Sequence, residues 1–166
     1  MPTWWARTTL YAQLAPDRLV LRNTRTGARF DEPAVLALKS KPDGKHMQVA
    51  AVGAAALALA GQSGVELVHP FRHPRSLLAD FVIAEQLLKA AVRAVWHPAW
   101  FAPTPRLVMH PLGAHEGGLT AVEVRALKEL AMAAGAGQAL VWQGVPLTDE
   151  QLQSGHYPQA GQVLAS

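Results

Sequence analysis

Hydrophobic and polar positions divide the chain into short strand-like runs in its first part and longer helical repeats in its second part. In the first part, short apolar runs are separated by turn residues such as Ala15-Pro16-Asp17, a pattern typical of β-hairpins. The runs that we expect to be strands lie at 8–14, 18–22, after the Thr26-Gly27 turn, at 33–38, at 48–52 and at 65–69. An alanine-rich stretch at 54–60, followed by Gly61, predicts a short helix between the last two.

An apolar stripe at helical spacing predicts a long amphipathic helix in the second part of the chain. The stripe consists of Leu77, Phe81, Leu88, Val92 and Val95. Asp80 is a suitable N-cap, and Pro98 requires the helix to end near Trp96. The elements expected after it are a strand at 107–109, a helix at 121–134 and a strand at 139–142. This alternation favours a mixed β-sheet with helices on its faces.

Composition narrows the class of protein further. Of 166 residues, 50% are hydrophobic and only 16% are charged, which is typical of a folded globular chain. Cysteine is absent, so disulfides and thiolate metal sites are excluded and a reducing cytoplasm fits. The net charge of +3 comes without any dense Lys/Arg block, so we expect no nucleic-acid binding. The longest apolar run, 49–60, is shorter than the ~20 residues that span a bilayer, and no signal peptide is legible, which predicts a cytoplasmic protein.

Seven short motifs follow one another in a fixed order along the chain. They are DEPAVLA (31–37), VAAVG (49–53), ADF (79–81), PRL (105–107), HPLG (110–113), VEVRA (122–126) and GAGQ (135–138). In the same order, the MreB/Mbl family of bacterial actin-like rod shape-determining proteins carries NEPSVVA, VAAVG, ADF, PRV, VPxG, VERRA and GAGA. The chain resembles the first half of that family over residues 10–145, and the ordered series is far more specific than any single motif.

The resemblance implies an α/β fold, the RNase H-like actin-type subdomain with a mixed β-sheet flanked by helices and a small inserted subdomain. We therefore predict one truncated actin-like domain over 1–166. Its core would comprise about 1–27 and 76–152, the inserted subdomain about 28–75, and a loose tail about 153–166. Thr148 opens a possible short helix just before that tail, which is rich in Ser, Gly, His, Pro and Gln.

The same resemblance points to a degenerate phosphate-binding turn. In the family, an Asp-Leu-Gly-Thr turn lies near the metal and the nucleotide phosphates, and Gln13, Leu14, Ala15 and Pro16 align with it. Gln13 is neutral, Ala15 adds a Cβ, and Pro16 lacks an N–H donor, so each change weakens a contact to phosphate or Mg²⁺. The second phosphate hairpin of the family would lie beyond Ser166. We therefore expect no cofactor, with ATP and Mg²⁺ bound only if a partner chain completes the site.

Glu123 has two interpretations. It falls on the position of the family's catalytic glutamate, which orients the attacking water, so it is the one candidate catalytic residue. Thr120-Ala121-Val122-Glu123 is also a capping box, a local reason sufficient for both Thr120 and Glu123. The second interpretation is supported by two departures from the family pattern: Val124 replaces an arginine, and 115–118 lengthens the preceding turn.

Histidines offer an alternative enzyme interpretation as metal ligands. The candidates are His69, His73, His110 and His115. His69 and His73 are four residues apart, but prolines flank them, so they do not share a helical face, and no motif of the HExxH kind occurs. We therefore predict no metal site.

Large aromatic side chains gather in a proline-rich loop and at the N-terminus. The candidates for membrane or partner contact are Trp96, Trp100, Phe101, Trp4 and Trp5. Trp100 and Phe101 stand where the resembling family carries an exposed apolar pair that enters the membrane, and Arg93 and Arg106 nearby would face anionic lipid. Packing on the core is the alternative for all five aromatic residues.

Together these observations predict an MreB-like structural or interaction protein related to the cell-shape cytoskeleton, without ATPase activity of its own. Its expected partners are an MreB-type filament or a second copy of itself, and it would lie in the cytoplasm or peripherally at the inner membrane. One alternative is half of an actin-like ATPase that a partner chain completes. Another is a small-molecule enzyme with a polar pocket around His110, His115 and Glu123.

Overall fold

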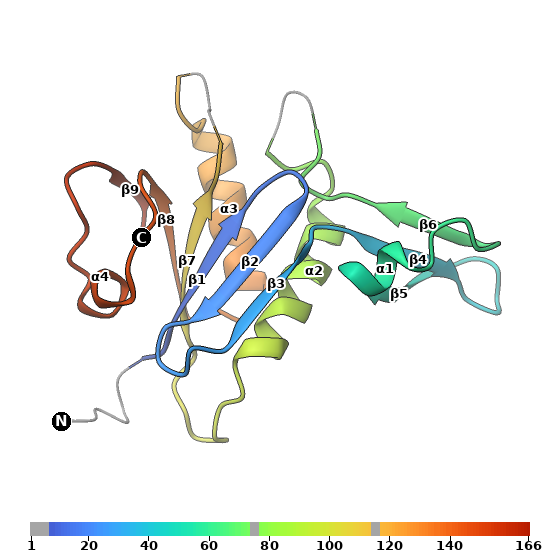
Figure 1. Ribbon diagram of the computed structural model, residues 1–166, viewed down its shortest axis with the longest axis horizontal. Helices are drawn as coiled ribbons and strands as arrows, with labels where there is room; N and C mark the ends of the chain where they lie inside the picture. Colours follow the sequence, from blue (N-terminus) through green and yellow to red (C-terminus); the bar gives the residue numbers. More distant parts are fainter. Residues whose placement is uncertain (1–6, 74–76, 114–116) are drawn as a thin grey trace.

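A six-stranded mixed β-sheet forms the centre of the computed structural model, which describes residues 7–73, 77–113 and 117–166. Its strand order is β3-β2-β1-β7-β8-β9 (Figure 1). The strands are β1 (Thr9–Leu14), β2 (Arg18–Asn23), β3 (Arg29–Pro33), β7 (Arg106–Pro111), β8 (Gln138–Gln143) and β9 (Gln162–Ala165). The pairs β1–β7 and β7–β8 are parallel and the other pairs are antiparallel, so the predicted mixed sheet is confirmed.

Helices cover both faces of this sheet. The long helices α2 (Phe81–Val95) and α3 (Ala121–Ala133) lie together on one face, where their Leu87 and Leu127 pack in the same core as Leu10 of β1 (Figure 1). The short helix α4 (Asp149–Ser154) covers the other face, and its Leu152 packs with Tyr11 and Trp142. Alternation along β1 produces this division, because successive side chains of a strand point to opposite faces. Among the described residues, no helix has both the length and the apolar character needed to cross a membrane.

Local sequence signals set the ends of the long helices. The Asp80 carboxylate accepts a hydrogen bond from the Ile83 N–H at 3.1 Å, which confirms the predicted N-cap of α2. Trp96 is the C-cap residue of α2, as Pro98 requires. The Thr120 hydroxyl accepts from the Glu123 N–H at 3.2 Å, and the Glu123 carboxylate accepts from the Thr120 N–H at 2.9 Å, so the predicted capping box of α3 is present.

A second, three-stranded sheet extends from the main one, in the order β5-β4-β6 (Figure 1). It contains β4 (Leu36–Ser40), β5 (Met47–Val52) and β6 (Val65–Val68), with α1 (Ala54–Leu57) packed on it. The helix predicted at 54–60 ends at Leu57 and continues in tighter turns, in which the Ala60 N–H donates to the Leu57 carbonyl at 3.1 Å.

The predicted start of the inserted subdomain, residue 28, needs correction, because β3 belongs to the main sheet. The strand expected at 33–38 corresponds to β4 and begins only at Leu36, because Pro33 still belongs to β3. The chain turns between them, where the Val35 N–H donates to the Pro33 carbonyl at 2.9 Å and the Ala34 N–H donates to the Asp17 carbonyl at 2.9 Å. Pro33 therefore ends pairing in one sheet, and Leu36 begins pairing in the other.

The predicted loose tail at 153–166 is wrong for its last part, which forms β9 against β8. The physical reason is Trp142 of β8, which is only 1% exposed and whose ring is covered by the returning chain. Tyr157 packs on that ring with centroids 5.5 Å apart, and a Cβ at Gly161 would collide with it. A few apolar contacts on one large ring thus order a segment whose composition is mainly polar.

Candidate functional site

The carboxyl ends of the parallel strands β1 and β7 form the edge at which the sequence predicts a degenerate phosphate turn. Ligands of open α/β sheets bind outside the carboxyl ends of the strands, so this edge is the first candidate site. Gln13 lies opposite His110 in the β1–β7 register, and the chain after β1 turns back into β2 at once. Leu14 is fully buried, Gln13 and Ala15 are half-buried, and Pro16 is exposed.

The β1–β2 turn closes on itself. The Ala15 N–H donates to the Arg18 carbonyl at 2.9 Å, and the Arg18 N–H donates to the Ala15 carbonyl at 3.4 Å. Pro16 has no N–H, and the Asp17 side chain is exposed at the tip of the turn. A phosphate site needs several convergent backbone N–H donors and little negative charge. Two donors of this turn are already used within it, and its tip carries a carboxylate.

Glu123 lies at the start of α3 with both carboxylate oxygens engaged. Oε2 accepts from the Thr120 N–H and from the Thr120 hydroxyl, each at 2.9 Å. Oε1 accepts from the Leu77 N–H at 3.2 Å. The carboxylate therefore fixes the helix start and ties it to the segment that leads into α2.

The candidate histidines are dispersed in the structure. Among the described residues, no three His, Asp or Glu side chains lie close enough together to hold a metal ion. His69 is partly buried and its pKa is lowered by desolvation, while His73 is exposed. His115 lies outside the described residues.

His110 is buried in a polar cluster that the sequence analysis missed. Its Nε2 lies 2.9 Å from the Gly144 carbonyl, which can only accept, so Nε2 carries the proton. Nδ1 then accepts from the Tyr11 hydroxyl at 2.5 Å, and that hydroxyl accepts from the Leu147 N–H at 3.2 Å. Burial lowers the pKa of His110 and raises the pKa of Tyr11, so both groups are neutral. Arg22 lies over the Tyr11 ring, 5.3 Å from its centroid. The cluster joins β1, β7 and the chain after β8.

The aromatic loop between α2 and β7 presents two large side chains to solvent. Trp100 is 97% exposed and Phe101 is 71% exposed, which excludes core packing for both. Trp96, by contrast, is half-buried and packs against the main core. Trp4 and Trp5 lie outside the described residues.

Of the two arginines expected to face lipid, Arg106 forms hydrogen bonds within the protein. The Arg106 guanidinium donates to the Thr9 hydroxyl at 2.9 Å and to the Leu152 carbonyl at 2.7 Å, so its prediction as a lipid-facing residue is wrong. The register of β7 beside β1 places Arg106 opposite Thr9, which the sequence did not reveal. Arg93 is exposed on the last turn of α2, and its Nε donates to the Lys89 carbonyl at 3.3 Å.

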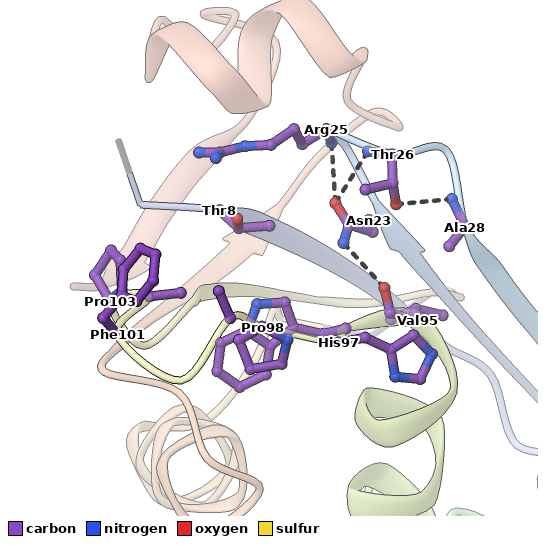
Figure 2. A pocket seen from close by; sticks show the side chains of 13 residues that line it. Thr8, Asn23, Arg25, Thr26, Ala28, Val95, His97, Pro98, Phe101 and Pro103 are labelled. Carbon is purple, nitrogen blue, oxygen red and sulfur yellow. Dashed lines mark hydrogen bonds between the residues drawn. The ribbon is translucent and has the colours of Figure 1, made fainter. Parts of the chain in front are cut away.

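A hollow of about 770 Å³, here called the loop groove, lies beside the exposed pair. Its walls come from the aromatic loop, the turn between β2 and β3, and the start of β1 (Figure 2). The lining residues are Thr8, Asn23, Arg25, Thr26, Ala28, Val95, Trp96, His97, Pro98, Ala99, Phe101, Ala102 and Pro103. The sequence analysis singled out the loop but missed the groove, because the groove needs three segments that are distant in sequence.

Comparisons with known proteins agree on one family. The family model described as MreB/Mbl protein matches residues 16–147. The chain is 35% identical to the cell shape-determining protein MreB of Haemophilus influenzae over 113 residues, which cover 68% of this chain and 31% of that protein. It is 34% identical to the protein of the same name from Escherichia coli, over 66% of this chain and 30% of that protein. The chain therefore spans less than a third of the length of these curated relatives.

Solved structures show the same fold. MreB5 of Spiroplasma citri bound to ADP matches 82% of this chain and 38% of its own, with a TM-score of 0.62 and 21% identity. A non-polymerising mutant of MamK bound to AMPPNP matches 81% of this chain and 40% of its own, with a TM-score of 0.63 and 19% identity. At these identities the likeness establishes the fold alone. The predicted actin-type α/β fold is thereby confirmed.

Proposed function

Because the chain belongs to the MreB/Mbl family, we propose that it is a cell-shape cytoskeletal protein that works through binding contacts and does not hydrolyse ATP by itself. The observation that carries the proposal is the self-closed β1–β2 turn. Its Ala15 and Arg18 N–H groups bond within the turn, Pro16 has no N–H, and Asp17 adds a carboxylate. A nucleotide at this edge would meet negative charge where it needs donors.

Glu123 supports the same proposal. Within the described part of the chain, its carboxylate accepts three hydrogen bonds, from the Thr120 N–H and hydroxyl and from the Leu77 N–H. A carboxylate that orients an attacking water needs an oxygen directed at that water. Here the three hydrogen bonds hold the start of α3, so a structural role is enough to explain why a glutamate stands at this position.

Calorimetry with ATP and Mg²⁺ tests the proposal. We expect the natural chain to show no binding tighter than about 1 mM, a free energy of about −4 kcal/mol. A variant with the turn changed by Gln13→Asp, Ala15→Gly and Pro16→Thr is the matched comparison, because it returns the family's residue types at these positions. Tight binding by the natural chain would refute the proposal. ATP hydrolysis that appears only when a separate second-half chain from a relative is added would instead support the completed-ATPase alternative.

We further propose that the protein contacts the cytoplasmic face of the inner membrane through Trp100 and Phe101. These two exposed aromatics lie next to each other at the tip of one loop. Tryptophan favours the boundary between headgroups and hydrocarbon, and one such contact gives weak, reversible binding.

Vesicle co-sedimentation tests this contact. Changing Trp100 and Phe101 to Ser should abolish sedimentation with vesicles. The matched control changes Val82 and Val145 to Ser, since these are exposed apolar residues outside the loop, at 63% and 48% exposure. Equal loss in both variants would show that general surface hydrophobicity, and not the loop, is responsible.

For partners, we propose self-association or addition to a filament of the MreB type, as family membership suggests. Sedimentation velocity over a range of concentrations, alone and with a full-length relative, tests this. A chain that stays monomeric and does not change the filament mass of the relative would contradict it.

A further inference from the structure

The last elements of the chain fold back over one face of the main sheet as a strap. The strap, defined here as residues 147–165, contains α4 and β9 and begins where the match to the family model ends (Figure 1). Its Leu147 and Leu152 are buried, and its Tyr157 packs on Trp142 of β8. These side chains form a hydrophobic cluster that is separate from the main core under α2 and α3.

Two hydrogen bonds hold the base of the strap to a buried pair of side chains. The Gly144 carbonyl accepts from His110 Nε2 at 2.9 Å, and the Leu147 N–H donates to the Tyr11 hydroxyl at 3.2 Å. The hydroxyl in turn donates to His110 Nδ1, so a continuous series of hydrogen bonds joins Gly144 to Leu147. The series requires a neutral His110, because only the neutral imidazole has one donor and one acceptor.

A proton on His110 breaks this series. Nδ1 then carries hydrogen, so the Tyr11 hydroxyl can no longer donate to it and must turn its own hydrogen elsewhere. His110 is 2% exposed and Tyr11 is 1% exposed, so the imidazolium and the displaced hydroxyl would both lie away from water, which costs free energy. Burial accordingly lowers the pKa of His110 while the strap is closed. Opening the base lets water reach the ring, so the open form takes up the proton more readily.

Neighbouring charges do not stabilise a protonated His110. Within the described part of the chain, its ring nitrogens bond only to Tyr11 and Gly144. The Asp149 carboxylate of α4 is already paired with Arg22, at 2.8 Å. The titratable and charged groups on the elements around the pair are Tyr11 on β1, Arg22 on β2, Arg106 on β7, Asp149 and Glu150 on α4, and His156 and Tyr157 after α4.

From this geometry we propose that the strap is an acid-sensitive closure: when His110 takes up a proton, its base opens and α4 and β9 separate from the sheet, while α2, α3 and the main core stay folded. The rest of the strap is held by few contacts. β9 pairs with β8 through three residue pairs with a shift in register, and its Leu164 and Ala165 are only partly buried. Weakly held elements of this kind open before the whole protein unfolds. The inference does not depend on the proposed membrane or filament contacts.

Fluorescence of Trp142 can follow the strap directly. The background variant carries Phe at the four other tryptophan positions, Trp4, Trp5, Trp96 and Trp100, which leaves Trp142 as the single indole. As the pH falls from about 7.5 to about 4.5, its emission should shift to the red and its quenching by acrylamide should increase. Most of the helical circular dichroism should remain, because α2 and α3 stay folded. The equilibrium constant for opening should rise by up to about tenfold per pH unit, the signature of one proton. Emission that does not shift, or helical signal lost at the same pH, would overturn the proposal.

Histidine variants identify the group that titrates. His110→Gln has no titrating ring, so its Trp142 emission should not change with pH in this range. His156→Gln is the matched control, because His156 is an exposed histidine on the strap itself, and this variant should respond like the background protein. A response that persists in His110→Gln, or that disappears in His156→Gln, would refute the role of His110.

Tyr11→Phe provides a test that does not require His110→Gln to fold. Loss of the hydroxyl removes the hydrogen bond that favours the neutral ring, so the strap should open at a higher pH than in the background protein. An unchanged midpoint would contradict the hydrogen-bonded pair as the sensor.

The ion pair between Arg22 and Asp149 is the competing sensor, since protonation of Asp149 would also loosen the strap. Asp149→Asn should weaken the closed form at every pH and keep a response of one proton. A response that vanishes in Asp149→Asn would assign the sensor to the ion pair and overturn the proposal.

Discussion

Replacing Glu123 by Ala measures how much the carboxylate contributes to the fold. The change removes the N3 half of the capping box, a loss of about 1 kcal/mol. It also leaves the Leu77 N–H, now bonded at 3.2 Å, without its acceptor, which costs about 1 kcal/mol at this part-buried site. The free energy of unfolding should therefore fall by about 2 kcal/mol. For a chain of this size, that corresponds to a drop in Tm of about 4–8 °C.

The comparison with Glu123→Gln separates a cap from a catalytic group. Glutamine also serves at N3 of a capping box, so this variant should lose at most about 1 kcal/mol, mainly its charge at the helix N-terminus. Glu129→Ala is the control on the same helix, because Glu129 pairs with the exposed Arg125 at the helix surface, and the change should leave the free energy of unfolding nearly unchanged. Urea denaturation followed by circular dichroism measures all three. An Ala variant as stable as the natural chain would refute the capping argument.

Three other changes have defined outcomes. Burial lowers the pKa of His110 below that of an ordinary histidine, about 6.5, so its contribution to stability is present above about pH 6.5 and is lost as the pH falls through the folded pKa. Urea denaturation between pH 7.5 and 5 should show this loss, and His110→Gln should reduce it. Gly161→Ala should cost about 1–3 kcal/mol, because its Cβ would meet the Trp142 ring, and unchanged thermal unfolding would contradict the close approach. Asn23→Ala should cost about 1–3 kcal/mol through the unpaired Val95 carbonyl, and hydrogen exchange of the Arg25 and Thr26 amides should accelerate.

Features that depend on a few neighbouring residues were predictable from the sequence. The Asp80 cap and the Thr120–Glu123 box each involve side chains and N–H groups within three residues, so the local pattern determines them. The long helix stripe is equally local, and its buried members Leu88, Val92 and Val95 follow the 3.6-residue period. The order of the motifs likewise predicted the fold, because the motifs fall on successive strands and helices of the two sheets.

Features that depend on distant partners were missed or misjudged. Tyr11 and His110 are 99 positions apart, and only the β1–β7 pairing brings them together. The same pairing brings the Arg106 guanidinium to the Thr9 hydroxyl, to which it donates a hydrogen bond, although its position in the sequence had suggested contact with lipid. The tail was misjudged because its composition is polar, whereas the ring of Trp142 that orders it lies in another element.

The enclosure of Trp142 gives the protein an internal optical probe. Its ring is shielded by Tyr157 and the chain at Gly161, and its Nε1 donates to the Val145 carbonyl at 2.9 Å. Trp100, in contrast, is almost fully in water. Fluorescence of the two indoles should therefore differ in colour and in quenching by iodide. In a variant with Trp4, Trp5 and Trp96 changed to Phe, detachment of the last strand would shift the blue component, and events at the loop would shift the red one.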